Sequence, residues 1–317
     1  MNHKLPIKID LPEHFLEEEM RCGYVVTEKQ KKIWAVELDL LSEFMRVCDK
    51  YDLKWFVGYG SLLGVIRHKG FIPWDNDIDI AITRQSFNRL CEVASKEFNY
   101  PYFLQTPVTE EGRYFRTSCK FCNSLTTGAS EREWLQGINC GLFMDIFILD
   151  EIPDDDKVVE KMFNKIGYYG HIARFLSPYP RHDNILGKMK NMVWTLIWKY
   201  KYHCCGGDVL FKELGEYLSQ FSGESSHRWM ALEVTPAESL HLDKTMWSQT
   251  IMADMEFMKV PIPNGYDWVL TDHYGDYMVL PSEQKRVNHA YLTLEPEIPY
   301  KVFFGGSNNT VSRNNNN

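Results

Sequence analysis

The sequence predicts an α/β fold, in which a mixed β-sheet is flanked by helices and interrupted by one helical insertion. Two segments predict strands of the sheet: acidic and apolar residues alternate over residues 75–80, and residues 141–150 are almost entirely apolar. Apolar residues recur at three- and four-residue spacing over 27–51 and 85–98, which predicts two helices that cover the sheet. Residues 157–222 look helical and are rich in aromatic and basic side chains, which predicts the insertion.

Composition places the chain among ordinary globular proteins. Its 317 residues allow one elaborated domain or two, and 44% hydrophobic with 25% charged residues is a common balance. The formal net charge of -8 argues against a nucleic-acid partner, because contacts to phosphates need a basic surface. Eight cysteines, with no apolar leader over residues 1–19, predict reduced thiols in the cytoplasm.

The first structured element after an irregular lead-in over residues 1–26 is a long helix. Thr27 and Gln30 fit a capping box at its start, and the helix is expected to run to about residue 51. Glu37 and Asp39 are assigned to the side of this helix that faces solvent. The opposite, core-facing stripe consists of large side chains: Trp34, Leu38, Leu41, Met45 and Cys48.

The most informative stretch follows a short apolar strand at 55–57, and it combines a Gly-Ser turn with three carboxylates. In a strand over 75–80, Asp75, Asp77 and Asp79 share one face. Three carboxylates on one face repel one another unless a cation lies between them, and hard divalent cations prefer such oxygen ligands. A solvated acidic edge strand is the alternative, but the apolar residues on the other face favour a site for metal and phosphate.

A lone acid, Asp145, stands in the middle of the apolar strand over residues 141–150. Burying an unpaired acid is costly. Asp145 is therefore expected either to bind a metal with the earlier aspartates or to pair with Lys120 or Arg116. Cys119 and Cys122 have a C-x-x-C spacing, but no second pair follows at zinc-site distance, so no structural zinc is expected.

The insertion is assigned to residues 157–255. Contact with a membrane surface is one interpretation of its basic, Trp-containing helices. A helical cap packed on the core is the other, and it is favoured because Glu160, Glu213 and Glu216 interrupt any one-sided basic face. The apolar stretch at 192–198 is too short to cross a bilayer.

Residues 256–300 are expected to complete the core, and 301–317 to form a disordered tail. The C-terminal segment holds an extended Val-Pro-Ile-Pro run at 260–263, a short helix over 266–273, and a Tyr-Gly-Asp termination that begins at Tyr274. Arg286 and His289 follow on a polar loop, where they could reach a phosphate or face solvent.

The string from Gly60 to Ile80, G-S-L-L-G-V-I-R-H-K-G-F-I-P-W-D-N-D-I-D-I, resembles the LicD family, whose members include the fukutin-related proteins. The C-terminal segment resembles the end of the same family. The common family pattern has Asp where this chain has Asn76. The resemblance implies a nucleotidyltransferase-like core, over residues 27–156 and completed by 256–300. It also implies transfer of phosphocholine, or a related phospho-alcohol, from a CDP-alcohol donor onto a glycan or sugar, as in lipopolysaccharide, capsule or teichoic acid synthesis.

The resemblance also suggests residue roles. Asp77, Asp79 and Asp145 would be catalytic ligands of Mg²⁺ or Mn²⁺. The residues expected to bind substrate or phosphate are Gly60, Ser61, Arg67, Lys69, Trp74, Asp75, Lys120, Tyr274, Arg286 and His289. Aromatic faces for a choline head are available at Trp74, Tyr59, Trp134 and Tyr274.

Three functional hypotheses stay open. The first is phospho-alcohol transfer, and the second is nucleotide transfer with release of pyrophosphate, because the same metal site supports both reactions. The third is a binding protein with a vestigial site, for which Asn76 is the motif change. The expected location is the cytoplasm, and peripheral contact with the inner face of the membrane is left open as an alternative.

Overall fold

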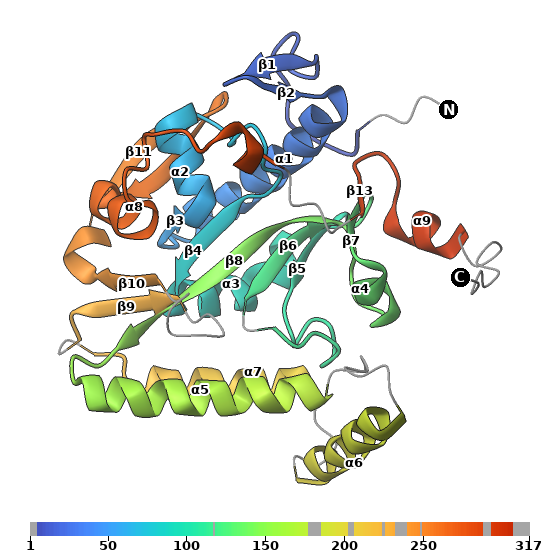
Figure 1. Cartoon of the computed structure of the whole chain (residues 1–317), viewed down its shortest axis with the longest axis vertical. Helices are drawn as coiled ribbons and strands as arrows, with labels where there is room; N and C mark the ends of the chain where they lie inside the picture. The colour runs from blue at the N-terminus through green and yellow to red at the C-terminus, as the bar shows by residue number, and fades with distance from the viewer. Residues whose placement is uncertain are drawn as a thin grey trace.

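A computed structural model describes residues 5–116, 118–176, 185–201, 206–223, 226–231, 240–247, 249–287 and 293–306. Within these residues a seven-stranded mixed sheet forms the centre of the molecule, with helices packed around it (Figure 1). The main path of the sheet runs β10-β9-β8-β4-β3, and β5 and β6 join it through β8. The bounds are β3 Trp55–Val57, β4 Asp79–Thr83, β5 Tyr102–Gln105, β6 Cys119–Asn123, β8 Leu142–Ile152, β9 Arg228–Ala231 and β10 Leu240–Asp243.

Strand β8 organises the sheet. Strand β4 pairs with it in parallel along one edge, while β6 and β9 pair with it antiparallel along the other. Leu142, Met144 and Ile146 are buried in the main core, and the intervening Phe143 and Asp145 are half-buried on the other face. The predicted strand over 141–150 is confirmed, and its alternation places Asp145 opposite the core side.

Helix α1 (Glu28–Lys50) begins where the capping pattern predicts, since the Thr27 hydroxyl accepts the N–H of Gln30 at 3.3 Å. Its apolar stripe faces the core as predicted, with Met45 partly buried and the other four residues fully buried. The assignment of Glu37 and Asp39 to the solvent side is wrong, because each is only 1% exposed. Asp39 accepts hydrogen bonds from two N–H groups of the N-terminal segment and from the Tyr102 hydroxyl, so that segment covers the face expected to be wet.

Helices α2 (Tyr59–His68) and α3 (Arg84–Glu97) flank the two ends of β4 in sequence. Helix α3 confirms the helix predicted over 85–98, and its Phe87 and Leu90 are buried. Helix α2 follows β3 directly, so its first turn lies beside the end of that strand and the start of β4, where Gly58 N–H donates to Asp79 O at 3.0 Å.

The insertion contains α5 (Asp156–Leu176), α6 (Ile185–Lys201) and α7 (Gly207–Ser219). Helix α7 contacts β8, and α5 lies along α7 (Figure 1). The insertion is less separate than expected, because its last part supplies β9 and β10 to the central sheet. A small second core joins the two parts: Ile152, Met162, Ile166, Leu214, Leu218 and Met230.

The C-terminal part returns to the main body. After a 3₁₀ turn (η1, Lys244–Trp247), β11 (Thr250–Met255) and β12 (Met258–Pro263) form a hairpin that contacts β3, followed by α8 (Tyr266–Tyr274) and a second 3₁₀ turn (η2, Glu283–Lys285). Strand β13 (Thr293–Glu295) then pairs with β7 (Thr127–Ala129), next to α4 (Glu131–Leu135).

Two predictions of irregular structure are corrected at the ends. Residues 19–26 form a small hairpin, β1 (Glu19–Arg21) with β2 (Tyr24–Val26), inside the segment expected to be irregular. Its Arg21 forms a bidentate pair with Glu256 at 2.6 and 2.9 Å, which ties the lead-in to the C-terminal hairpin. Residues 300–306 form helix α9 (Tyr300–Gly306), where a disordered tail was expected, because Tyr300 and Phe304 pack against Trp134; residues 307–317 lie outside the described part.

Candidate active site

Two acids from distant parts of the chain lie on neighbouring strands of the sheet. Asp79 opens β4, and it is the register partner of Asp145 on β8. The Asp145 N–H donates to the carbonyl of Ile78 at 2.9 Å, which extends the ladder by one residue. Partners in register point to the same face of a sheet, so both carboxylates project from one face. The predicted adjacency of the two strands is therefore found, while the role of these acids stays a prediction.

Asp75 and Asp77 precede Asp79 in a loop, whereas the sequence predicted that all three aspartates would lie in one strand. Strand β4 begins only at Asp79, so both precede it in a loop and do not share a strand face. Ser61 fixes this loop from α2: its hydroxyl donates to Asp77 O at 3.3 Å and accepts the Asp79 N–H at 2.9 Å. Ser61 was expected to bind phosphate, but its hydroxyl is engaged in positioning the aspartates.

Helix α1 holds the other end of the loop. The side-chain N–H groups of Gln30 and Trp34 both donate to the carbonyl of Asp75, at 3.3 and 2.9 Å. Because both donors lie on a buried helix face, the loop conformation is determined by packing.

Gly60 marks the point where carboxylates converge over the first turn of α2. The Oδ2 atoms of Asp75 and Asp79 lie 3.7 and 3.8 Å from the place that a Cβ on Gly60 would take. The N-terminus of a helix favours negative charge, through its free N–H groups and its dipole. Phosphate binding at Gly60 stays a prediction, because the negative groups found beside it are the two carboxylates.

The pKa values of two of these acids, Asp77 and Asp145, are raised by their surroundings. Asp77 is exposed at the surface of the fold, but desolvation on the inner side of its carboxyl, with the charges of Asp79 and Asp75, raises its pKa well above the ordinary value. A hydrogen bond between the carboxyls of Asp75 and Asp77 acts in the same direction. Burial also raises the pKa of Asp145, against the opposing charges of Lys120 and Arg116.

Glu37 is a further acid that the sequence analysis did not assign to the site. Burial, with the charges of Asp145, Asp79 and Asp75, raises its pKa well above the ordinary value. Its Oε2 atom is buried without a hydrogen-bond partner. One signal in the sequence was available, because Glu37 and Asp39 are the two polar residues in an otherwise apolar run of α1, from Ile33 to Leu41.

Lys120 lies on the far side of Asp145. It is the register partner of Asp145 on β6, it is 3% exposed, and its ammonium binds Glu133 Oε1 at 3.1 Å. The ammonium also lies 3.4 Å from the centre of the Phe143 ring. Asp145 therefore has Asp79 beside it on β4 and Lys120 beside it on β6, but Lys120 and Arg116 each form an ion pair with Glu133. Lys120 itself is a buried, bound cation, which argues against direct binding of phosphate.

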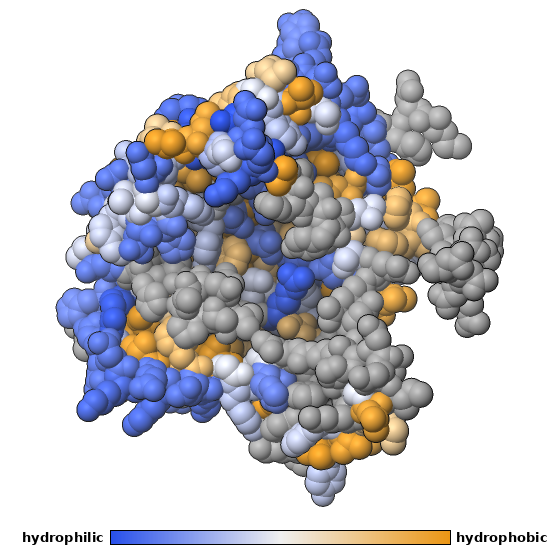
Figure 2. Space-filling model, viewed as in Figure 1, coloured by the Kyte–Doolittle hydropathy of each residue, from blue (hydrophilic) through white to orange (hydrophobic). Residues whose placement is uncertain are grey.

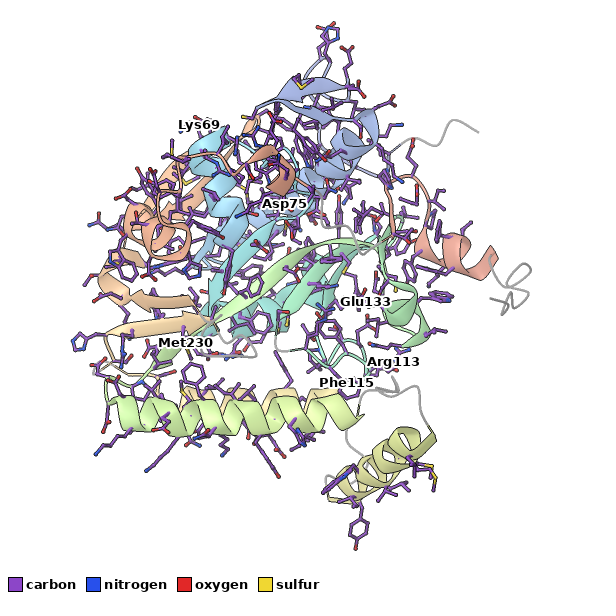
Figure 3. The ribbon with its side chains drawn as sticks, viewed as in Figure 1. Lys69, Asp75, Arg113, Phe115, Glu133 and Met230 are labelled. Carbon is purple, nitrogen blue, oxygen red and sulfur yellow. The ribbon has the colours of Figure 1, made fainter. Side chains whose placement is uncertain are left out.

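The other predicted basic residues surround α2 and the C-terminal loop. Arg67 donates to the carbonyl of Tyr277 at 2.8 Å, and Arg286 donates to Cys22 O at 2.9 Å, with its guanidinium 5.8 Å from the Trp74 ring. Lys69 is exposed near the outline of the molecule, whereas Asp75 lies nearer the centre in the same view (Figure 3). His289 lies outside the described residues.

Two tyrosines, Tyr274 at the end of α8 and Tyr59 at the start of α2, are the aromatic candidates here. Tyr274 is 43% exposed, and desolvation of its hydroxyl together with the charges of Asp79, Asp75 and Asp77 raises its pKa to about 12. The Tyr59 ring lies 4.4 Å from Phe147 and 6.5 Å from His273. Trp134, by contrast, stacks on Phe304 at 5.3 Å in a separate apolar cluster, so it packs in the fold and is not grouped with the other aromatic candidates.

The ligand types at this site suit a hard cation. Among the described residues, no three His, Cys, Asp or Glu side chains are already gathered at metal-binding spacing. The acids are instead close in pairs, and one buried carboxylate oxygen of Glu37 has no donor. An all-carboxylate set with surplus negative charge fits a divalent cation such as Mg²⁺.

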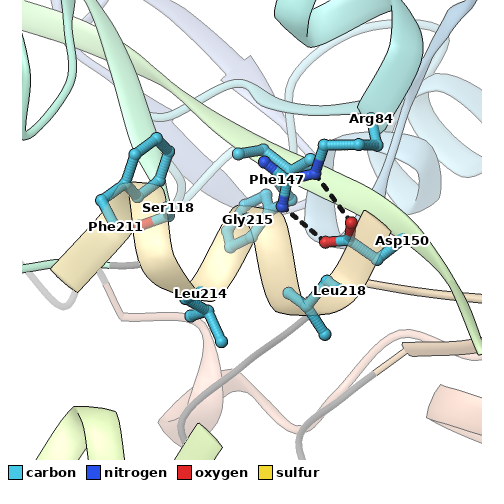
Figure 4. Close-up of a pocket in the computed structure, with 9 residues that line it drawn as sticks. Arg84, Ser118, Phe147, Asp150, Phe211, Leu214, Gly215 and Leu218 are labelled. Atoms are coloured by element: carbon cyan, nitrogen blue, oxygen red, sulfur yellow. Dashed lines mark hydrogen bonds and ion pairs between the residues drawn. The ribbon is translucent and has the colours of Figure 1, made fainter. Parts of the chain in front are cut away.

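A separate small cavity lies beside β8, lined by residues such as Phe147, Phe211 and Leu218 (Figure 4). Its volume of about 20 Å³ has room for roughly one water molecule, so it is no nucleotide site. On its wall Arg84 binds Asp150 in a bidentate pair at 2.7 and 2.6 Å. This pair joins α3 to β8 and is structural.

Residues 52–138 match the family described as LicD/FKTN/FKRP, nucleotidyltransferase domain. The chain is 29% identical over 260 residues to the lipopolysaccharide cholinephosphotransferase LicD of Haemophilus influenzae, covering 80% of this chain and 92% of that protein. An uncharacterized protein of Rickettsia prowazekii is 37% identical over 116 residues, or 36% of this chain and 39% of that protein. The predicted resemblance and the nucleotidyltransferase-like α/β fold are confirmed.

Proposed function

We propose that this chain belongs to the LicD family and transfers a phospho-alcohol, of the phosphocholine type, from a CDP-alcohol donor onto a hydroxyl of a glycan. The observation that carries the proposal is the meeting of Asp75 and Asp79 over the start of α2, with Asp145 in register beside Asp79. The similarity to a protein named lipopolysaccharide cholinephosphotransferase supports the group transferred and the class of acceptor.

Asp77, Asp79 and Asp145 are the proposed ligands of Mg²⁺ or Mn²⁺. When bound, the ion supplies charge neutralisation for the donor diphosphate and favours ionisation of the acceptor hydroxyl. Phosphoryl-type transfer needs positioning and charge stabilisation more than covalent help from the protein. The clamp on the acidic loop by Ser61 and by α1 provides that positioning.

The reaction forms a bond between the acceptor oxygen and the phosphorus of the phospho-alcohol, and it breaks the bond from that phosphorus to the bridging oxygen. Cytidine monophosphate leaves, and the acceptor hydroxyl loses a proton. Asp145 is the proposed acceptor of this proton. Its raised pKa is suited to holding a proton, and Lys120 on the neighbouring strand limits how far the pKa rises.

The remaining residues have proposed roles in donor binding. The first-turn N–H groups of α2, at Gly60 and Ser61, face the position suited to a phosphate oxygen. Lys69 is exposed and available, while Arg67, Arg286 and His289 are proposed to approach from the side of the C-terminal loop. Tyr274 and Tyr59 offer ring faces to a quaternary ammonium head, with Trp74 as an outer wall.

Nucleotide transfer is the second candidate, because the matching family is described by a nucleotidyltransferase domain. Incubation with CDP-choline labelled separately in the cytidine and the choline distinguishes the two reactions. Choline label on a glycan acceptor with free cytidine monophosphate supports the proposal. Cytidine label on the acceptor contradicts it, as does pyrophosphate release from a nucleoside triphosphate.

Replacing Asp145 with Asn tests the site itself. We expect turnover to fall at least about a hundredfold, because a ligand and the proton acceptor are lost together. The rise in melting temperature with Mg²⁺ should shrink, while the fold stays intact. Asp254→Asn, on the exposed edge of β11, is the matched control and should keep both properties. Full activity of the Asp145 variant would contradict the assignment.

A further inference from the structure

Helix α6 exposes an apolar face that the described parts of the fold leave uncovered. The helix contacts α5 and projects from the lower part of the molecule, where apolar atoms gather on the surface (Figures 1 and 2). Leu186 is 81% exposed, Leu196 60% and Tyr200 88%. The other exposed apolar side chains of the helix are Met189, Met192, Val193, Trp194 and Ile197. Exposed apolar area of this extent on one helix indicates an interaction surface.

The exposed residues form one stripe along the helix. At 3.6 residues per turn, seven of them, all except Trp194, fall within an arc of about 140°. The stripe consists of Leu186, Met189, Met192, Val193, Leu196, Ile197 and Tyr200. The stripe runs from Leu186 to Tyr200, so at 1.5 Å per residue it extends for about 21 Å along the helix. This is the periodicity of a helix that lies flat against an apolar layer.

Lysine positions border the stripe on both sides. By the same helical repeat, Lys188 and Lys199 occupy positions along one edge, and Lys190 and Lys201 occupy positions along the other. Lysine stems pack on apolar surface while their ammonium groups stay in a polar layer, so this arrangement matches the boundary between acyl chains and headgroups.

Charge selects among possible partners. Residues 185–201 contain four lysines and no acid, although the whole chain carries 43 acidic residues against 35 basic ones. Two copies of α6 packed stripe to stripe would bring two sets of lysines together, which disfavours a dimer through this face. An anionic lipid surface offers acyl chains to the apolar stripe and negatively charged headgroups to the lysines at its edges. No described helix is long and apolar enough to cross a membrane, so α6 would lie on the surface.

We propose that α6 is an interfacial helix that binds the surface of an anionic bilayer, with its stripe in the outer acyl region and its lysine edges at the headgroups. The proposal does not depend on the transferase reaction, because it rests on α6 alone. It also differs from the sequence-based preference for a helical cap, since the stripe faces outward.

Vesicle sedimentation with the full chain tests the proposal. We expect the protein to sediment with vesicles that mix phosphatidylglycerol and phosphatidylcholine, and at least about tenfold less with pure phosphatidylcholine. Leu196→Asp places a charge in the stripe and should weaken binding to the anionic vesicles at least about tenfold. Thr195→Asp adds the same charge one residue away, at a position outside the stripe, and should weaken binding less than about threefold.

Several results would overturn the proposal. One is no sedimentation of the wild type with anionic vesicles, and another is equal binding to neutral and anionic vesicles. Equal losses in the two Asp variants would also contradict a stripe, provided that circular dichroism shows both to be folded. A wild-type dimer that Leu196→Asp dissociates, without vesicle binding, would assign the face to self-association. Loss of transferase activity in solution bears on the proposed reaction and not on α6.

Discussion

At Glu37, a carboxyl group is buried in helix α1 close to three other acids. Its Oε2 has no hydrogen-bond partner, and burial with the charges of Asp145, Asp79 and Asp75 raises its pKa. A buried charge is costly unless it is paired, so without a cation Glu37 holds a proton more tightly in the folded chain than in the unfolded one. Ionised Glu37 therefore destabilises the fold through its repulsion with the neighbouring acids, and a bound cation would reduce that repulsion.

The first prediction concerns Glu37→Gln, which removes the charge and keeps the shape. A carboxyl with a raised folded pKa loses stability as the pH rises above its unfolded value of 4.5, since the unfolded state ionises first. Without metal at pH 7, the variant should therefore be more stable than the wild type by about 1 kcal/mol or more, and the gain should vanish below about pH 4.5.

Urea unfolding at several pH values measures this difference. Glu92→Gln is the matched control, because Glu92 is exposed and pairs with Arg89 on the surface of α3, so no such pH-dependent gain is expected. A Glu37→Gln variant that is less stable than the wild type at pH 7 would show that Glu37 makes a favourable ionic contact in the fold.

At the scale of elements, the site depends on how α2, the acidic loop and β4 are held together. The Ser61 hydroxyl bridges the carbonyl of Asp77 and the N–H of Asp79, and the residue is only 7% exposed. Two backbone groups of the acidic loop thus depend on one side chain of the neighbouring helix. Loss of that bridge should affect both stability and the placement of the carboxylates.

The second prediction compares Ser61→Ala with Ser86→Ala. Ser86 is 8% exposed, and its hydroxyl accepts the Lys54 N–H at 2.8 Å, away from the acids. Each change should cost about 1 kcal/mol of stability, because each leaves a buried backbone donor unpaired. Only Ser61→Ala should also raise the Mg²⁺ concentration needed for half-maximal thermal stabilisation, by about tenfold. Equal metal responses of the two variants would argue against a positioning role for Ser61.

Local patterns predicted much of this arrangement. The capping residue Thr27, the stripe of α1 and the apolar strand around Asp145 depend on neighbouring residues in the chain, and the structure confirms them. Asp75 and Asp77 were placed in a strand because alternation in a loop looks the same in sequence as alternation in a strand. The acids that surround Glu37 come from the acidic loop and β8, which lie far away in sequence, so the apolar run of α1 could indicate that Glu37 is buried but not what it is buried against.

Strand pairing over long distances was the other part that the sequence left open. Strands β9 and β10 come from the insertion, more than seventy residues after β8 pairs with β4, and yet they extend the same sheet. Strand β9 pairs with the part of β8 that contains Asp150. The sequence predicted Asp150 only as the last residue of its strand, whereas in the structure it is buried and bound by Arg84. Such pairings depend on the whole set of packed elements, and no local motif specifies them.

For the whole molecule, the acids link segments that are far apart in the chain. The charges of the acidic loop before β4 act on Glu37 of α1 and on Tyr274 of α8, and the charge of Asp145 on β8 also acts on Glu37. A cation bound among them would connect the N-terminal, central and C-terminal segments at once. Because a ligand that binds only the folded state stabilises the whole fold, Mg²⁺ binding should be visible as a change in global melting.

The last prediction is that this stabilisation grows with pH. Asp77, Asp145 and Glu37 all have raised pKa values, so at lower pH protons occupy the carboxylates that the ion needs. Between about pH 5 and pH 8, the melting temperature without metal should fall relative to an Asp77→Asn variant, while the rise caused by saturating Mg²⁺ should increase. In Asp77→Asn, one competing proton and one ligand are gone, so the Mg²⁺-induced rise should be smaller and should change less with pH. A wild-type rise that is as large at pH 5 as at pH 8 would mean that the ion binds away from these acids.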